Sequence, residues 1–141
     1  MTKMIPFRMI GNLYFVGTRE ASCHMIDTGD GLILIDTGCE ENAETVTESV
    51  TALGFDMRDV KIILHSHGHY DHSDATAKLL KLTPNAKTYL SRHNVEKEGN
   101  GALGVSGGKQ TFYPSVAEGD LVTVANVKIG CEAFDIFHVV P

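Results

Sequence analysis

The chain has 141 residues, of which 43% are hydrophobic, and it carries a formal net charge of −6 at pH 7. This length and composition predict one globular domain with a hydrophobic core of its own. The acidic balance argues against binding to nucleic acid or to an anionic membrane surface, although bound divalent metal ions would reverse the potential locally.

The cysteines and the apolar runs bear on the cellular compartment of the protein. The three cysteines are far apart and form no C-x-x-C pair, which fits a reducing compartment better than a disulfide framework. The apolar runs are too short to cross a membrane, and the first residues contain no apolar signal region. We therefore expect a cytoplasmic protein.

The first third of the sequence predicts short strands joined by tight turns. Two candidate strands, 12–16 and 22–26, are followed by glycine or by the turn sequence Asp-Thr-Gly-Asp-Gly of residues 27–31. Glycine and aspartate at these positions tolerate positive φ and favour a hairpin. The continuous apolar run 32–35 predicts a strand that is covered on both faces.

Two helices are expected around the middle of the chain. Residues 40–53 have carboxylates in the first turn and apolar residues at helical spacing, with Gly54 as the C-terminal cap. A buried strand, 61–64, follows. The second helix is expected to begin with Ser73 or Asp74 as its N-cap. Its buried face is expected to consist of Ala75, Leu79 and Leu82, and Pro84 is expected to end it.

The last third predicts mainly strands. Residues 87–90 form a candidate strand, and a short helical piece is expected at 94–98. The glycine-rich stretch 99–108 predicts a mobile loop that borders a pocket, and it lacks the Gly-Lys-Ser/Thr pattern of a phosphate cradle. Residues 120–140 contain three candidate strands with a turn at 125–126. Helices interleaved with a mixed sheet give an α/β layered architecture.

The sequence His-Gly-His-Tyr-Asp-His, residues 67–72, is the most informative stretch of the chain. It comes directly after the apolar strand 60–64, and open α/β sheets usually bind their substrates at the carboxyl ends of strands. His67 and His69 point to the same side if the backbone is extended. Imidazole and carboxylate are ligands that suit zinc and its neighbours, so we expect a metal site here.

The spacing predicts two pairs of ligands. His67 and His69 supply two ligands for a first metal ion, while Asp71 and His72 supply two for a second. Metal coordination lowers the pKa of bound water from about 15.7 to about 7 and thereby produces a nucleophile at neutral pH. Asp71 lies between the histidine pairs, and we expect it to orient the nucleophile and accept its proton.

Three segments together resemble the metallo-β-lactamase superfamily. The strand and H-x-H-x-D-H motif of residues 60–73 is similar to the metal signature of that family, and the apolar strand ending in Asp-Thr-Gly, 32–38, is similar to its second landmark. Residues 12–17 resemble its opening strand. The resemblance implies an αββα sandwich with a mixed sheet and flanking helices. It also implies that Asp36 lies beside the metal ions without binding them.

Finer features are most similar to the subclass B3 branch of that superfamily. They are Pro6-Phe7 ahead of residues 12–14, and the sequence Ser-His-Gly-His-Tyr-Asp-His of residues 66–72. Members of the superfamily hydrolyse β-lactams, thioesters, lactones or phosphoesters. The resemblance therefore implies a small-molecule substrate and one or two Zn²⁺ ions, with iron as the alternative metal.

The resemblance covers only part of the family's pattern. The family's third histidine, bridging carboxylate and last histidine come later in sequence, and residues 137–141 resemble the approach to its Pro-Gly-His motif. His138 is therefore not assigned to the metal. We expect residues 1–141 to be a single domain that corresponds to the N-terminal half of the fold and is truncated at its C-terminus. We also expect one apolar face of the sheet to lack its partner within residues 1–141. A homodimer or the second half of the fold would then cover this face.

Four functions are compatible with these observations. A zinc-dependent hydrolase of a lactam, thioester, lactone or related ester is the leading hypothesis. An iron-dependent redox protein of the same fold and a non-catalytic half-domain that serves as an interaction module are the alternatives, and a nuclease is disfavoured by the acidic charge. We expect His65 to be packed beside the ligands, and His24 and His93 to be ordinary histidines.

Overall fold

The computed structural model describes residues 2–90, 121–132 and 136–140 of the chain. Its centre is a six-stranded mixed sheet with the strand order β1-β2-β3-β4-β5-β6. The first four strands pair antiparallel, whereas β4, β5 and β6 are parallel to one another. These strands are β1 (Phe7–Ile10), β2 (Leu13–Phe15), β3 (His24–Asp27), β4 (Leu32–Ile35), β5 (Val60–Leu64) and β6 (Lys87–Tyr89).

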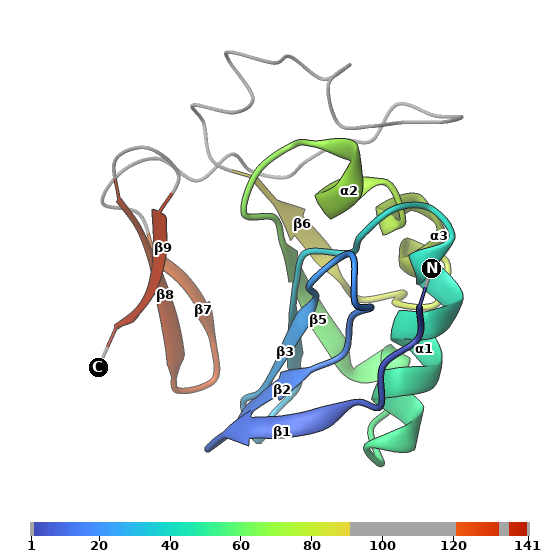
Figure 1. Ribbon diagram of the computed structural model, residues 1–141. Helices are drawn as coiled ribbons and strands as arrows, with labels where there is room; N and C mark the ends of the chain where they lie inside the picture. Colours follow the sequence, from blue (N-terminus) through green and yellow to red (C-terminus); the bar gives the residue numbers. More distant parts are fainter. Residues whose placement is uncertain (1, 91–120, 133–135, 141) are drawn as a thin grey trace.

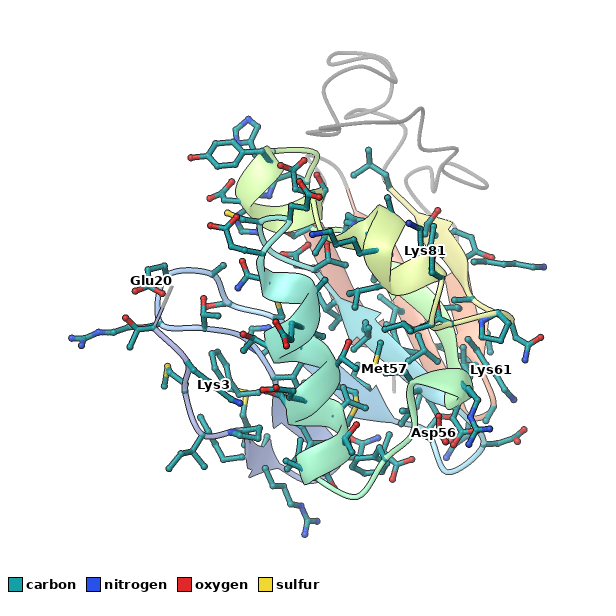
Figure 2. The ribbon with its side chains drawn as sticks, turned by 90° about the vertical axis from the view of Figure 1, so that its right-hand side faces the viewer. Lys3, Glu20, Asp56, Met57, Lys61 and Lys81 are labelled. Atoms are coloured by element: carbon teal, nitrogen blue, oxygen red, sulfur yellow. The ribbon has the colours of Figure 1, made fainter. Side chains whose placement is uncertain are left out.

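The two faces of this sheet are covered by different layers (Figure 1). On one face lie α1 (Asn42–Ala52) and α3 (Thr76–Leu80), which Figure 2 shows crossing the sheet. On the other face lies a small antiparallel sheet made of β7 (Leu121–Val124), β8 (Val127–Glu132) and β9 (Ile136–Val140). The short helix α2 (Tyr70–Ser73) and the 3-10 turn η1 (Met57–Asp59) complete the described elements.

The core on the helical side explains why α1 has its observed length. Val46 and Val50 of α1 are buried against the sheet, as the helical spacing predicts. The helix ends in a Schellman motif, because Gly54 donates to the carbonyl of Thr51 and Phe55 donates to the carbonyl of Val50. Gly54 has φ +89°, so the prediction of a glycine cap is confirmed.

The second core lies between the two sheets. Along β4 the side chains alternate, since Leu32 and Leu34 face the helices and Ile33 faces β7 and β8. The prediction of a strand covered on both faces is therefore confirmed. The expectation that this face of the sheet is bare is wrong. The core residues between the two sheets are at most 8% exposed. They are Ile26, Ile33, Ile62, Leu64, Val124, Val127 and Ile129.

The second helix differs from the prediction. The chain forms two short helices, and the first of them begins at Tyr70, inside the histidine motif. Neither Ser73 nor Asp74 caps a helix through its side chain, because the Ser73 hydroxyl donates backwards to the carbonyl of His69. Leu82 is 45% exposed and lies beyond the end of α3, so it does not belong to the buried face.

The remaining expectations divide into three groups. The three strands of residues 120–140 are confirmed, and Ala125 has φ +50° in the turn between the first two. Strand β1, at the edge of the sheet, was not predicted. The helical piece 94–98 and the glycine-rich stretch 99–108 lie outside the described residues.

Substitution of Ile33 tests the packing between the two sheets. We expect Ile33→Ala to lower the free energy of unfolding by about 2–5 kcal/mol, since Ile33 is fully buried and truncation leaves a cavity. Urea denaturation measures this difference. Ile10→Ala is the matched control, because Ile10 on β1 is 76% exposed and should change stability by less than about 0.5 kcal/mol. Equal losses in the two variants would contradict the described core.

Candidate metal centre

The candidate centre lies at the carboxyl ends of β4 and β5. Ile35 and Leu64 are neighbours in the parallel register, so the residues that follow each strand emerge at the same edge of the sheet. After β5 the chain forms the segment 66–72, hereafter the histidine loop, which ends inside α2. After β4 it forms the Asp-Thr-Gly segment 36–38. These two segments supply the candidate ligands and the carboxylate of Asp36.

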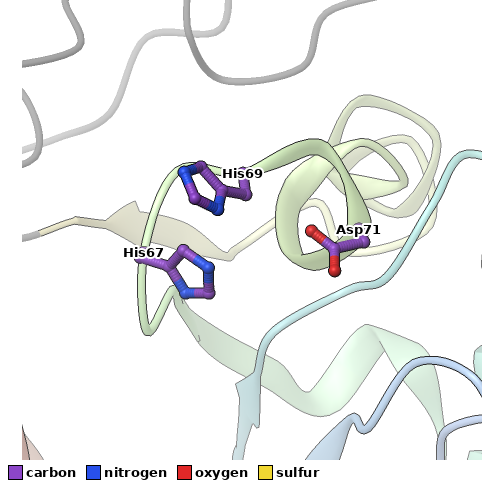
Figure 3. Close-up of side chains that lie close together, drawn as sticks. All are labelled: His67, His69 and Asp71. Carbon is purple, nitrogen blue, oxygen red and sulfur yellow. The ribbon is translucent and has the colours of Figure 1, made fainter.

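Three of the predicted ligands form one group (Figure 3). One donor atom each from His67, His69 and Asp71 lies within 4.8 Å of the other two. Figure 3 shows both histidines on the extended part of the histidine loop and Asp71 at the start of the helical turn. The rings of His67 and His69 have their centroids 4.6 Å apart. The structure therefore brings these three predicted ligands together.

His72 lies directly beside this group. Its ring centroid is 4.1 Å from that of His67, and its Nε2 atom is 3.5 Å from Oδ2 of Asp71. Its Nδ1 atom lies 2.8 Å from Oδ2 of Asp36. When Nδ1 donates its proton to this carboxylate, the lone pair of Nε2 is left free on the side of Asp71.

Asp36 is the hub of the hydrogen bonds around the centre. Its buried carboxylate accepts from the backbone N–H of Ser66 at 2.7 Å and from the Ser66 hydroxyl at 2.6 Å, in addition to His72. Its own N–H donates to the carbonyl of Leu64 at 2.8 Å. The residue has φ +60°, a conformation that aspartate tolerates better than most residues. This conformation turns the side chain from β4 towards the histidine loop.

The Asp-Thr-Gly segment also forms hydrogen bonds with the backbone of α2 and of the residue before α3. The N–H of Thr37 donates to the carbonyl of His72 at 2.8 Å, and the N–H of Ala75 donates to the carbonyl of Gly38 at 3.1 Å. Gly38 has φ +79°, and a Cβ atom there would lie 2.7 Å from Cγ of Asn42. Glycine is therefore required at this position, because both the conformation and the space exclude a side chain.

His65 is fully buried at the base of the histidine loop. Its Nε2 atom lies 2.7 Å from the hydroxyl of Thr76, and its Nδ1 atom lies 3.3 Å from the carbonyl oxygen of Tyr89. Burial lowers the pKa of His65 to about 4, so the imidazole is neutral near pH 7. The expectation that His65 is a packed residue beside the ligands agrees with this geometry.

The electrostatics of the centre favour the neutral form of the His67 imidazole. The pKa of His67 is lowered, first by burial and then by the neighbouring charges of His72 and His69. A neutral imidazole offers a lone pair to a metal ion, whereas a protonated one does not. The partial burial of His67 therefore keeps it in the form that binds metal.

Sequence reasoning named the ligand candidates and Asp36 but missed the groups that hold them. It assigned no role to the Ser66 hydroxyl, to Thr37 or to Thr76. The available signal for Ser66 and Thr37 was their position immediately after two strands, because the ends of neighbouring parallel strands meet at one edge. No sequence signal pointed to Thr76, whose contacts arise from the packing of α3.

The comparisons with known proteins agree with this geometry. A family model described as "Metallo-beta-lactamase superfamily" matches residues 16–138, and the chain belongs to this superfamily. The chain is similar to BJP-1, a subclass B3 metallo-beta-lactamase of Bradyrhizobium japonicum, with 29% identity and a TM-score of 0.82 over 94% of this chain and 52% of that one.

Two further solved structures give the same result. FEZ-1 from Legionella gormanii is 28% identical with a TM-score of 0.82, over 93% of this chain and 53% of that one. GOB-18 from Elizabethkingia meningoseptica is also 28% identical with a TM-score of 0.82, over 93% of this chain and 51% of that one. The chain thus spans about half the length of the structures it matches, and the resemblance to the subclass B3 branch is confirmed.

Within residues 2–90, 121–132 and 136–140, no helix has the length and apolar character needed to cross a membrane.

The burial of His65 predicts how stability depends on pH. The folded protein holds His65 neutral down to about pH 4, whereas the unfolded chain takes up this proton near the ordinary value of 6.5. The unfolded state therefore binds more protons between these values, and the free energy of unfolding falls as the pH is lowered through them. Urea denaturation of metal-free protein across this range measures the slope.

His65→Gln is the variant that isolates this contribution. Glutamine does not titrate, so the variant should lose less stability than the parent between pH 6.5 and about 4. The remaining slope comes in part from His67 and His24, whose pKa values are also lowered by burial. Identical slopes in the parent and in the variant would show that His65 is not the group responsible.

Proposed function

We propose that the protein is a zinc-dependent hydrolase that acts on a small-molecule substrate. The observation that carries this proposal is the group formed by His67, His69 and Asp71, whose donor atoms lie within 4.8 Å of one another. The orientation of His72 by Asp36 supports it further, because carboxylate–histidine pairs typically fix the rings of zinc ligands. Membership of the metallo-beta-lactamase superfamily supports the reaction class.

The donor set fits zinc. Imidazole nitrogen and carboxylate oxygen are both ordinary zinc ligands. We propose that His67 and His69 hold one ion and that Asp71 and His72 hold the second. Asp71 lies within reach of both groups, since it belongs to the cluster with His67 and His69 and is 3.5 Å from Nε2 of His72.

Each ion would have only two ligands from the described residues. Catalytic zinc usually takes three protein ligands and keeps one open position. We therefore propose that the remaining ligands come from sequence that the structure does not describe, which agrees with the chain spanning about half the length of its structural matches. Residues 1–141 would then be a single domain that corresponds to the N-terminal half of that fold.

The residues of the chain divide the chemical work between them. A zinc ion bound here supplies a Lewis acid that polarises a carbonyl group and lowers the pKa of water. Asp71, whose side chain is 46% exposed, is placed to orient that water and accept its proton. Tyr70 is 64% exposed beside it and is available to contact a substrate. Asp36 and Ser66 are buried or half-buried and keep the rings in place.

The substrate class follows from the same reasoning. In a lactam, thioester, lactone or related ester, water attacks the acyl carbon and negative charge develops on the carbonyl oxygen, which a bound metal ion would stabilise. A β-lactam is the first substrate to test, because the similar structures are subclass B3 metallo-beta-lactamases.

Metal content and hydrolysis together test the proposal. We expect one to two zinc ions per chain, and hydrolysis of a chromogenic cephalosporin or of an activated thioester that EDTA abolishes and added zinc restores. His69→Ala should lower zinc affinity by more than roughly 100-fold, because loss of a group that only hydrogen-bonds to a metal ligand already costs up to about that much. His24→Gln, on β3, is the histidine control and should keep the metal.

Two results would separate the parts of the proposal. A chain that holds far less than one zinc ion, with no difference between the parent and His69→Ala, contradicts the metal site. A chain that holds zinc but hydrolyses no member of these substrate classes contradicts the hydrolase and leaves the site in place.

Asp36→Asn tests the contribution of the buried carboxylate. Asparagine keeps the shape and also tolerates positive φ, so the variant removes the charge without forcing the backbone. We expect zinc affinity to fall about 10- to 100-fold, because His72 loses its charged acceptor. Equilibrium competition with a zinc-sensitive dye measures this change, with circular dichroism to confirm folding. Unchanged affinity would exclude a role for this charge in metal binding.

A further inference from the structure

We propose that His65 is a positioning residue, which fixes the backbone of His72 through the hydroxyl groups of Thr76 and Thr37. The proposal rests on the proposed function in one respect, since it takes the histidine loop to be the metal-binding segment. The contacts that carry it run through side chains of His65, Thr76 and Thr37, which are not among the proposed metal ligands.

The contacts form a continuous chain from β6 to His72. Nε2 of His65 lies 2.7 Å from Oγ1 of Thr76, and that oxygen lies 3.0 Å from Oγ1 of Thr37. The Thr37 hydroxyl has one proton and donates it to Thr76, so its 3.2 Å contact with the carbonyl oxygen of His72 is not a second hydrogen bond. That carbonyl accepts from the Thr37 N–H at 2.8 Å, and this bond completes the chain. At the other end, the N–H of His65 donates to the carbonyl of Tyr89 at 3.0 Å.

A count of protons shows which nitrogen of His65 donates. The hydroxyl of Thr76 donates its only proton to the carbonyl of Ser73, at 2.6 Å. With that proton used, the Thr76 oxygen accepts from His65, and we assign the proton of the neutral ring to Nε2. The carbonyl of Tyr89 accepts from the backbone N–H of His65 at 3.0 Å, and its contact with Nδ1 is longer, at 3.3 Å, and carries no proton in this tautomer.

Burial makes this chain of contacts energetically important. His65, Thr37 and Thr76 are each fully buried. A buried hydroxyl or carbonyl that loses its partner cannot turn to water and pays the cost of desolvation. Loss of the Nε2 donor therefore favours a shift of α3 relative to β5, and Thr37 and His72 move with it.

The consequence is that His72 is fixed from two sides. Asp36 holds the imidazole ring, while the chain of contacts from His65 holds the carbonyl of the same residue. A ring that is held only at its Nδ1 atom can still rotate with its backbone. Both restraints are needed to fix where Nε2 points, and metal affinity depends on this direction.

Two amide variants separate the nitrogens of His65. Glutamine places an NH₂ group near the position of Nε2 and can keep the bond to Thr76, whereas asparagine reaches only the position of Nδ1 and cannot. We therefore expect His65→Gln to behave like the parent and His65→Asn to lose the positioning of His72. Ser49→Ala is the control, because it removes a buried hydroxyl from α1 that has no partner in the described structure.

The first measurement needs no metal. Hydrogen exchange of the Thr37 amide reports its bond to the carbonyl of His72. Exchange in His65→Asn should be faster by about tenfold or more at a temperature where all variants are folded, while His65→Gln and Ser49→Ala stay close to the parent. Equal acceleration in the asparagine and glutamine variants, or none in either, would overturn the proposal.

The second measurement is cobalt(II) binding, followed by its visible absorption. We expect His65→Asn to bind cobalt about 10- to 100-fold more weakly than the parent, and His65→Gln to retain the affinity and the spectrum. If Thr37 exchange changes as expected but the parent binds no cobalt, the positioning role stands and the proposed metal site fails. If the parent binds cobalt and both variants bind it equally well, the positioning role fails.

Discussion

The parallel pairing of β4 with β5 is the constraint on which the candidate centre depends. It places the ends of two strands, separated by a helix in the sequence, at one edge of the sheet. Asp36 leaves the first strand and the histidine loop leaves the second, so a buried carboxylate meets Ser66 and His72 without any long connection. Because strands of the same direction end together, one crossover through α1 is sufficient to assemble the polar groups of the centre.

The centre is held by groups that do not themselves bind metal. Asp36 has an unfavourable φ and a buried charge, and each cost is offset by bonds to Leu64, Ser66 and His72. His65 and the buried threonines add a second set of restraints beneath the loop. The exposed His69 and the half-buried Asp71 remain on the open side. This arrangement combines rigid support with access for solvent.

Local patterns in the sequence were sufficient for most of the architecture. The alternation of buried faces in 32–35, the glycine cap at Gly54 and the strand before the histidines each follow from the chemistry of a few adjacent residues. The division of the second helix was not predictable in this way. Its cause is the competition of the Ser73 hydroxyl and of the Asp-Thr-Gly segment for backbone groups between residues 69 and 75, which involves residues far apart in sequence.

The sequence by itself determined the identity of the ligand candidates, because imidazole and carboxylate at H-x-H-x-D-H spacing suit few roles other than metal binding. It also determined, by resemblance, that Asp36 lies beside the ligands. Only the tertiary structure decided that the Asp71 carboxylate lies close to His67 and His69 and also to His72. It also decided that His65 connects to His72 through two threonines. The physical reason is that hydrogen bonds between side chains of different elements depend on packing distances, which no local sequence pattern encodes.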